Sequence, residues 1–251
     1  MKRFSDIYRN SKLHYFISSF LERFEMEGFT ISYSQSGEDL VLKAIFGKNK
    51  RSGFFVDVGC NNPIQKNNTF KLYLKGWSGI NIDGNEGQIK KYKSLRKRDI
   101  SLNEVISNEN KEIIFFQDDY NPALSCVDPS IANDLKAQQH NIKEIRKTAK
   151  TLEGILDQYG NNRPIDLLCV DVEEHDLEVL QGNNFQKYRP QIICIECFDD
   201  IKTIPGNEVN TFLIKNGYEL IAVSSPNIFY NDKFNPIKII KNSSPAPGQL
   251  H

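Results

Sequence analysis

The sequence predicts an α/β protein with a mostly parallel, Rossmann-like sheet, flanking helices and a C-terminal antiparallel hairpin. Short apolar runs alternate with segments of helical spacing along most of the 251 residues, which is typical of parallel strands joined by right-handed crossovers. Two further strand-like runs, 218–224 and 228–230, are separated by only three residues. Because a parallel crossover needs a dozen residues or more, this spacing favours a hairpin.

The first half of the chain begins with helices. Phe16, Phe20 and Phe24 belong to an apolar stripe at helical spacing, which predicts one or two amphipathic helices within residues 1–32. The elements expected after that stripe are a short helix at 37–46, a strand at 53–58, a helix centred on 72–74 and a strand at 79–83.

The second half continues the alternation. We expect strands at 100–107 and 113–117 that form an antiparallel hairpin, because the linker between them is short. The elements expected next are a mainly helical stretch at 135–160, strands at 165–172 and 191–196, and helices opening at 177 and 209. The run at 165–172 is the most apolar and predicts a central strand that is buried on both faces. Residues 33–240 are expected to form one domain, followed by a flexible tail at 241–251.

Composition excludes several classes of protein. The 32 Lys and Arg residues balance 32 Asp and Glu residues, so the formal net charge is zero and no net field would recruit nucleic acid. No apolar run approaches the roughly 18–20 residues of a membrane span. The five cysteines are scattered and odd in number, which argues against a disulfide framework and favours a reducing, cytoplasmic location.

Acidic residues stand at the predicted strand ends, where open parallel sheets bind ligands. Asp57 and Gly59 close the first strand, and Asp83 closes the second. Two carboxylates at adjacent strand ends favour a nucleoside-containing ligand, although an ordinary tight turn with solvated acids stays open. Asp99, Ile100 and Ser101 open the third strand and are candidates to contact an adenine edge; an ordinary turn is the alternative.

The densest group of ionisable residues follows the central strand. Asp171, Glu173 and His175 would share one face if the chain stayed extended. Crowded carboxylates raise one another's pKa values and should raise the pKa of an adjacent histidine, as suits a proton-accepting site. The alternative is an acidic helix N-terminus, which the helix dipole also favours.

Five ordered blocks between residues 33 and 224 resemble the FkbM family of methyltransferases. The blocks are Tyr33–Asp39, Gly53–Gly59, Leu72–Asp83, the stretch from Ile165 through His175 to Gly182, and Arg189-Pro190. The resemblance implies a class I methyltransferase fold, S-adenosyl-L-methionine as cofactor, and methylation of hydroxyl groups on sugars and related metabolites. Glu174 stands where the family usually has glycine.

The resemblance also implies roles for individual residues. Asp57, Gly59 and Asn61 would line the methionine end of the cofactor, Asp83 the ribose, and Asp99 to Ser101 the adenine. Gln35 and Glu38 would lie at the mouth of the cofactor site. Within the acidic group, His175 and then Asp171 are the candidate bases, with Glu173 beside them. Glu196, at the end of the next strand, resembles an acidic residue common in the family and is a further candidate to face the acceptor.

The main hypothesis is therefore a cytoplasmic O-methyltransferase that acts on a hydroxyl of a sugar or glycan precursor and needs no metal. One alternative is metal-assisted transfer with Asp171, Glu173 and His175 as ligands; another is a non-catalytic scaffold that binds the cofactor. A basic run between Lys136 and Lys150 suggests an anionic acceptor. The aromatic N-terminal helices are candidates for a homodimer contact.

Overall fold

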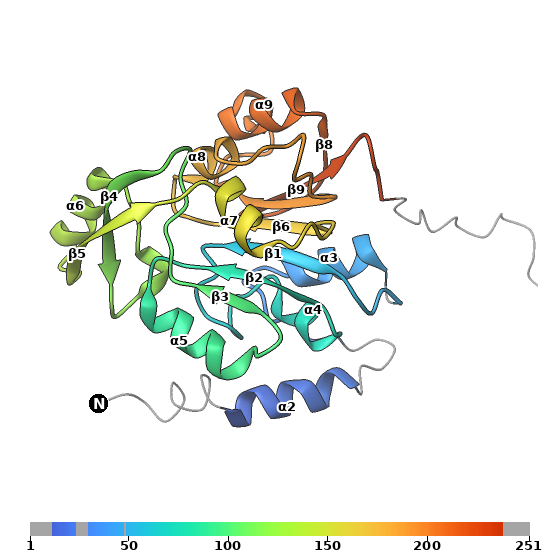
Figure 1. Ribbon diagram of the computed structural model, residues 1–251. Helices are drawn as coiled ribbons and strands as arrows, with labels where there is room; N and C mark the ends of the chain where they lie inside the picture. Colours follow the sequence, from blue (N-terminus) through green and yellow to red (C-terminus); the bar gives the residue numbers. More distant parts are fainter. Residues whose placement is uncertain (1–11, 24–29, 48, 238–251) are drawn as a thin grey trace, which may run out of the picture.

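The computed structural model describes residues 12–23, 30–47 and 49–237. Within these residues, one seven-stranded sheet has the order β3-β2-β1-β6-β7-β9-β8 (Figure 1). Its strands are β1 Phe54–Val58, β2 Ser78–Ile82, β3 Ile100–Leu102, β6 Leu167–Val170, β7 Ile192–Glu196, β8 Tyr218–Ser224 and β9 Asn227–Asp232. The first five are parallel, and β9 pairs antiparallel with both β7 and β8. This architecture confirms the predicted fold class, the central place of β6 and the closing hairpin.

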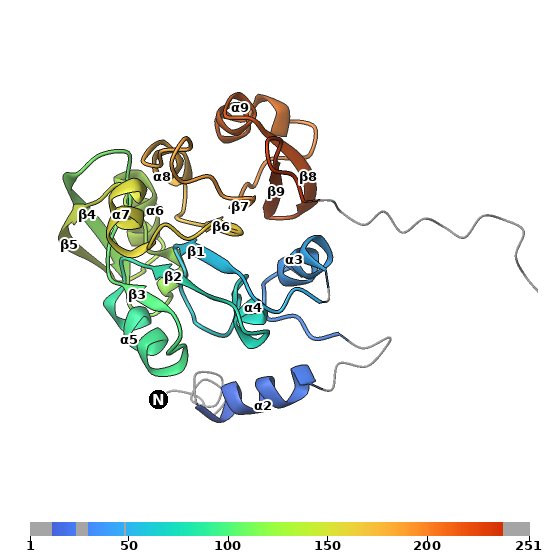
Figure 2. The ribbon, with the colours of Figure 1, turned by 45° about the vertical axis from the view of Figure 1, so that its right-hand side comes forward.

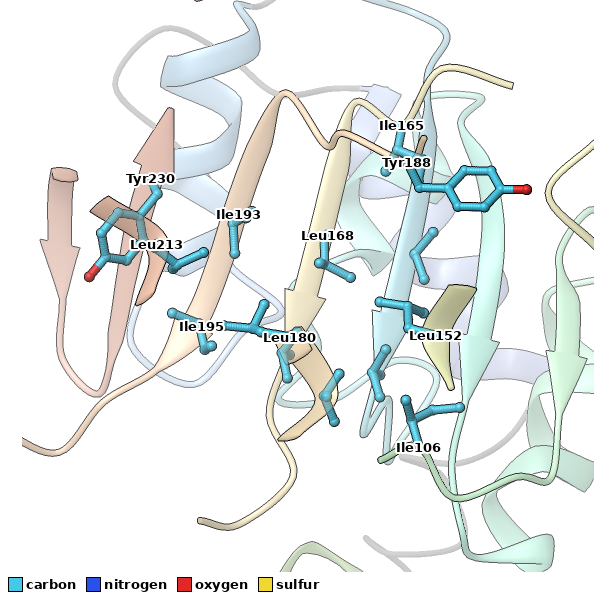
Figure 3. Close-up of a cluster of buried hydrophobic side chains, with 14 of the residues drawn as sticks. Ile106, Leu152, Ile165, Leu168, Leu180, Tyr188, Ile193, Ile195, Leu213 and Tyr230 are labelled. Carbon is cyan, nitrogen blue, oxygen red and sulfur yellow. The ribbon is translucent and has the colours of Figure 1, made fainter. Parts of the chain in front are cut away.

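Helices cover both faces of the sheet. Successive side chains in each strand point to opposite sides, so both faces carry apolar side chains that must be covered. Val56 of β1 packs in a large core with Leu168 of β6 and with three helices, α7 Leu152–Tyr159, α8 Asp176–Gln181 and α9 Glu208–Lys215 (Figure 3). Phe55, one residue earlier, belongs to the core on the other face. There it packs with α3 Glu38–Phe46 and α4 Phe70–Leu74 (Figure 2).

Helix α5, Glu86–Leu95, ends at a fully buried arginine. The Arg96 guanidinium lies 4.9–5.2 Å from the ring centres of Phe55, Tyr73 and Tyr92. It donates to Asp99 at 2.8 Å through Nε. Buried charges persist in proteins when they are paired and hydrogen bonded, so this network fixes the segment that follows α5.

Helix α2, Lys12–Arg23, is part of the predicted N-terminal helical segment. Tyr15 packs against Phe70 and Tyr73, with ring centres 6.0 and 6.3 Å apart, whereas Phe16 is 68% exposed and Phe20 is 54% exposed. The homodimer contact stays a prediction. Residues 1–11 and 24–29 of that segment, and the predicted tail at 241–251, lie outside the described residues.

The segment between β3 and β6 differs from its prediction. β4, Lys111–Asp118, does not pair with β3 but forms a separate two-stranded antiparallel sheet with β5, Ile142–Ala149. The predicted helical stretch thus contains a strand, which is preceded by α6, Pro129–Ala137, and followed by α7. This strand is difficult to predict from the sequence because it contains several charged residues. Lys147 occupies a half-buried position above the Phe115 ring, and an apolar residue there would have given the alternating apolar and polar pattern of a strand.

All five cysteines are free and buried. No helix in the described ranges is long and apolar enough to cross a membrane.

Candidate active site

A cavity of about 330 Å³ opens at the carboxyl edge of the parallel strands. The loops after β1, β2, β3 and β6 and the end of β7 line it, and residues of β4 and of the segment 121–127 complete the wall. β1 lies between β2 and β6, so the strand order reverses here. Open α/β sheets bind their ligands at such a point.

Gly59 brings the loop after β1 against the loop after β6. Its φ is +79°, and a Cβ atom there would lie 1.7 Å from the carbonyl oxygen of Asp171. A side chain would therefore push the two loops apart and strain the backbone. Asn61, which also lines the cavity, donates its backbone N–H to the Asp83 carboxylate at 2.8 Å.

Asp83 is held in place at the end of β2. Besides Asn61, the backbone N–H of Asn85 donates to its carboxylate at 2.7 Å. Burial raises the Asp83 pKa to about 6, although both hydrogen bonds oppose the shift. Each carboxylate oxygen retains a further lone pair, and the side chain lines the cavity. Asp83 is therefore built to accept hydrogen bonds from neighbouring hydroxyl groups of a ligand.

The cavity wall beside Asp83 is apolar. Val105, Phe115 and Leu124 line this part. A Cβ atom on Gly84 would lie 2.5 Å from the Phe115 ring, so the ring packs directly on the glycine backbone. A flat aromatic ligand group suits such a wall. Val105, Phe115 and Leu124 could not be predicted as site residues from the sequence, because their position depends on how the segment between β3 and β6 folds.

Asp57 lies behind this cavity and does not line it. It is 6% exposed and accepts a hydrogen bond from the Thr69 hydroxyl at 2.7 Å. Burial raises its pKa to about 6 against the lowering effects of Thr69 and Arg96. In this structure Asp57 supports the loop from beneath, in contrast to the ligand contact implied by the family resemblance.

The placement expected for Asp99, Ile100 and Ser101 needs correction. β3 runs parallel to β2, and Ile82 pairs with Leu102, so the end of β3 faces the cavity and its beginning faces away. None of the three residues lines the cavity. The Asp99 carboxylate is already engaged by Arg96, by Asn81 and by a backbone N–H.

Gln35 and Glu38 occupy different positions. Gln35 lines the cavity, as expected for its mouth, whereas Glu38 is fully buried beneath it. Glu38 accepts from the backbone N–H of Ser36 at 2.7 Å and from the Asn227 amide at 3.1 Å. It therefore fixes the turn that carries Gln35.

Three carboxyl groups form an acidic cluster, which consists of Asp171, Glu173 and Glu196. One oxygen from each lies within 4.8 Å of the others, and Asp171 and Glu196 share a hydrogen bond. Burial, followed by repulsion from neighbouring acids, raises the pKa of Glu173 to about 7 and that of Glu196 to about 10. The pKa of Asp171 is raised as well, mainly by burial. This cluster can accept a proton or hold a cation.

The chain reaches the cluster through a left-handed turn. Glu173 has φ 53° and Glu174 has φ 67°, a region that costs a non-glycine residue about 1–2 kcal/mol. The turn expected of a glycine at position 174 is therefore present although Glu174 occupies it. Because the chain is not extended here, the predicted shared face of Asp171, Glu173 and His175 does not form.

His175 lines the cavity but lies outside the acidic cluster. Its Nε2 is 3.1 Å from the Ser107 hydroxyl, and its Nδ1 is 3.5 Å from the Glu178 carboxylate. The prediction of a raised pKa is wrong. Burial lowers the pKa of His175 below its usual value, against the opposing charges of Glu178 and Asp128. The imidazole is neutral at pH 7, and Glu196 takes the place predicted for His175 in the acidic group.

The basic run between Lys136 and Lys150 does not line the cavity. Its residues are divided between α6, β5 and the chain on either side of β5. Several are engaged elsewhere: Lys136 with Glu144, and Lys150 with Glu104. The cavity therefore lends no support to the anionic acceptor suggested by this run.

A seven-stranded sheet in this order, with a ligand cavity at its switch point, defines the α/β fold of the class I methyltransferases. Comparison with family models gives a match to the methyltransferase FkbM domain over residues 57–220. The chain belongs to the FkbM family of methyltransferases. A comparison with curated proteins gave no match.

Proposed function

We propose that this methyltransferase uses S-adenosyl-L-methionine to methylate a hydroxyl group of a sugar, a glycan precursor or a related small metabolite. The observation that carries the proposal is one cavity with an anchored carboxylate at one end and proton-accepting carboxyl groups at the other. Asp83 marks the first end, and the acidic cluster marks the second.

The residues of the cavity fit this cofactor. The Asp83 carboxylate suits the two hydroxyl groups of a ribose, and the wall of Val105 and Phe115 suits an adenine. Gly59 lines the cavity at the proposed methionine end, where its missing side chain lets the loops after β1 and β6 meet. The nearby carboxylates of the acidic cluster attract positive charge.

The bound cofactor would supply an electrophilic methyl group on a sulfonium. Transfer of this methyl group to the acceptor oxygen would release S-adenosylhomocysteine. The hydroxyl proton must go to a group of the protein. Glu173 suits this step best, because it lines the cavity and a pKa of about 7 balances proton affinity against availability at neutral pH. The larger contribution of the protein would be to hold the acceptor oxygen in line with the methyl group.

A metal-assisted variant of this reaction is the second candidate. Asp171, Glu173 and Glu196 each place an oxygen within 4.8 Å of the other two, a spacing compatible with carboxylate ligands around one divalent cation. This set replaces the predicted one, because His175 faces Ser107 and Glu178. A cation there would lower the pKa of the acceptor hydroxyl directly.

Calorimetric titration with S-adenosylhomocysteine tests the cofactor, and an acceptor screen that detects this product tests the reaction. We expect binding and turnover on a hydroxylated acceptor. Absence of binding at millimolar ligand would overturn the proposal. Running the screen with and without a chelator separates the two mechanisms, since only the metal-assisted one loses activity and regains it with added Mg²⁺.

A further inference from the structure

A second cavity adjoins the first. Its volume is about 250 Å³, and Glu196 and Phe198 line both cavities. Its remaining wall comes from the beginnings of α8 and α9 and the segment after β7. The Gly59 and Asp83 loops do not contribute to it. The space therefore begins at the acidic cluster and continues away from the proposed cofactor site.

The wall of this second cavity is strongly acidic. It carries five carboxyl groups and no lysine, arginine or histidine. The five residues are Glu174, Asp176, Glu196, Asp199 and Glu208. They come from the turn after β6, the start of α8, the end of β7, the following segment and the start of α9. No basic side chain of the wall neutralises them, so the cavity favours a positively charged occupant.

Asp176 gives an independent sign of a missing partner. The residue is 7% exposed, and its Oδ1 has no hydrogen-bond partner among the described residues. The backbone N–H groups of Val172 and of Asp176 itself oppose the rise in the pKa of this carboxyl group. A buried polar atom left without a partner costs about 1–3 kcal/mol, and in native proteins such atoms call for an explanation. A ligand that donates hydrogen bonds in this cavity would supply one.

The spacing of the acids distinguishes between kinds of cation. Within the described residues, the group that could hold one metal ion is Asp171, Glu173 and Glu196, and Asp176 is not part of it. The acids of the second cavity are spread around a wider space that also has apolar walls from Leu177, Phe198 and Val209. This combination suits an organic ammonium group attached to a carbon skeleton.

We propose that the second cavity binds the acceptor through a protonated amine, so that the methylated substrates are hydroxylated amines such as amino sugars. This inference rests on the proposed function and names its substrate class. The cofactor's own amine is not the occupant, since the proposed cofactor site lies between the Gly59 and Asp83 loops. An acceptor held by its ammonium group would extend past Glu196 and bring a hydroxyl to the acidic cluster.

Release of protons on ligand binding is a further expected property of this cavity. Burial and repulsion from Asp171 raise the pKa of Asp176 to about 8. An ammonium group stabilises the charged form of this acid. Binding near pH 7 should therefore release protons, and affinity should rise with pH until the amine itself deprotonates. Glu174, Asp199 and Glu208 are the other acids that line the same space.

The test uses three matched probes: the methyl glycosides of glucosamine, N-acetylglucosamine and glucose, with the galactose series alongside. Each is titrated into the full-length protein in the presence of S-adenosylhomocysteine, in two buffers that differ in ionisation enthalpy. We expect an amino glycoside to bind about tenfold or more tightly than its N-acetyl and neutral counterparts, with proton release. The same order should appear in kcat/KM.

The first double variant is Asp176→Asn with Glu208→Gln. The second is Glu174→Gln with Glu208→Gln, which leaves the buried Asp176 unchanged and is used if the first double variant folds poorly. Both should reduce the preference for the amine and leave S-adenosylhomocysteine affinity within a few-fold. Glu219→Gln, at an exposed position of β8, is the matched control. It should change neither the preference for the amine nor the affinity for S-adenosylhomocysteine.

Equal binding of the amino and N-acetyl glycosides would overturn this inference while the proposed function stands. So would tight binding of Mg²⁺ alone that the same double variants abolish. Failure of S-adenosylhomocysteine to bind would overturn the proposed function, and this inference with it.

Discussion

The ideal Cβ position of Gly59 lies 1.7 Å from the backbone carbonyl oxygen of Asp171. The loop that follows β1 and the loop that follows β6 are therefore in direct backbone contact at the floor of the cavity. The loop after β1 continues to Asn61, whose backbone N–H binds Asp83. The loop after β6 carries Asp171 and Glu173 of the acidic cluster. The proposed cofactor and acceptor ends of the site are joined here.

Gly59→Ala should destabilise the protein by about 2–4 kcal/mol, because a Cβ atom meets backbone and φ is positive. Urea unfolding measures the change. Gly206→Ala is the matched control, since nothing lies within 4 Å of that position, and it should stay within about 0.5 kcal/mol of the wild type. A similar loss in both variants would contradict the contact.

Asp83→Ala should weaken S-adenosylhomocysteine binding about 10- to 150-fold, or about 1.5–3 kcal/mol, because it removes a charged acceptor from two ribose hydroxyls. Calorimetry measures the dissociation constant. Glu86→Gln, three residues along and exposed, should leave it unchanged. If Asp83→Ala binds as tightly as the wild type, the ribose lies elsewhere.

Glu173→Gln should lower kcat by about 10²–10⁴, the usual range when a general base is removed. In the wild type the rate should rise with pH through about 7 and then level off, since Glu173 must be deprotonated to accept the proton. The variant should lose this rise. His175→Asn should keep it, because His175 is already neutral at pH 7. A pH–rate profile in which only His175→Asn flattens would make the histidine the base.

Glu174→Gly should stabilise the protein by about 0.5–1 kcal/mol. Relief of the left-handed backbone contributes about 1–2 kcal/mol, and the extra freedom of glycine in the unfolded chain offsets part of it. Chemical denaturation measures the difference. Glu219→Gly in β8 should instead destabilise, because that residue is not among those with positive φ. A loss of stability in Glu174→Gly would show that the glutamate side chain makes a compensating contact.

Stability should fall as pH rises from about 5 to 8. Asp176 has a pKa of about 8 in the folded protein against 3.8 as its ordinary value, so in this window the folded state holds a proton that the unfolded state lacks. Glu196, at about 10 against 4.5, acts in the same direction. Melting temperatures across this range measure the effect, and Asp176→Asn should reduce the slope. A slope equal to that of the wild type would mean that Asp176 is charged in the folded state.

Local patterns were sufficient to predict most of the sheet. The apolar runs that became β1, β2, β6 and β7 are continuous because both of their faces are buried, and such runs are visible in sequence. β5 was missed because Lys143, Arg146 and Lys147 occupy a strand that is covered on one side only. Its partner β4 was consequently paired with the wrong strand.

The site could be predicted only in part, for a related reason. Gly59, Asn61, Asp83, Asp171, Glu173 and His175 follow strands that the sequence reveals, and all of them line the cavity. Asp99 does not line the cavity because it precedes β3, and the other end of that strand faces the cavity. The second cavity could not be foreseen, since it depends on how α8, α9 and the end of β7 meet in space.

The buried Arg96 has a consequence for the order of folding. Its ring and carboxylate neighbours all lie between Phe55 and Asp99, nearer in sequence than residues such as Phe55 and Leu167, which pair between β1 and β6. Contacts between residues close in sequence form at a lower entropic cost than distant ones. We therefore expect β1, β2 and β3, together with Asp83, to fold early around this arginine. β6 and then β7 would pack onto this half later and bring Asp171 and Glu196 to the site.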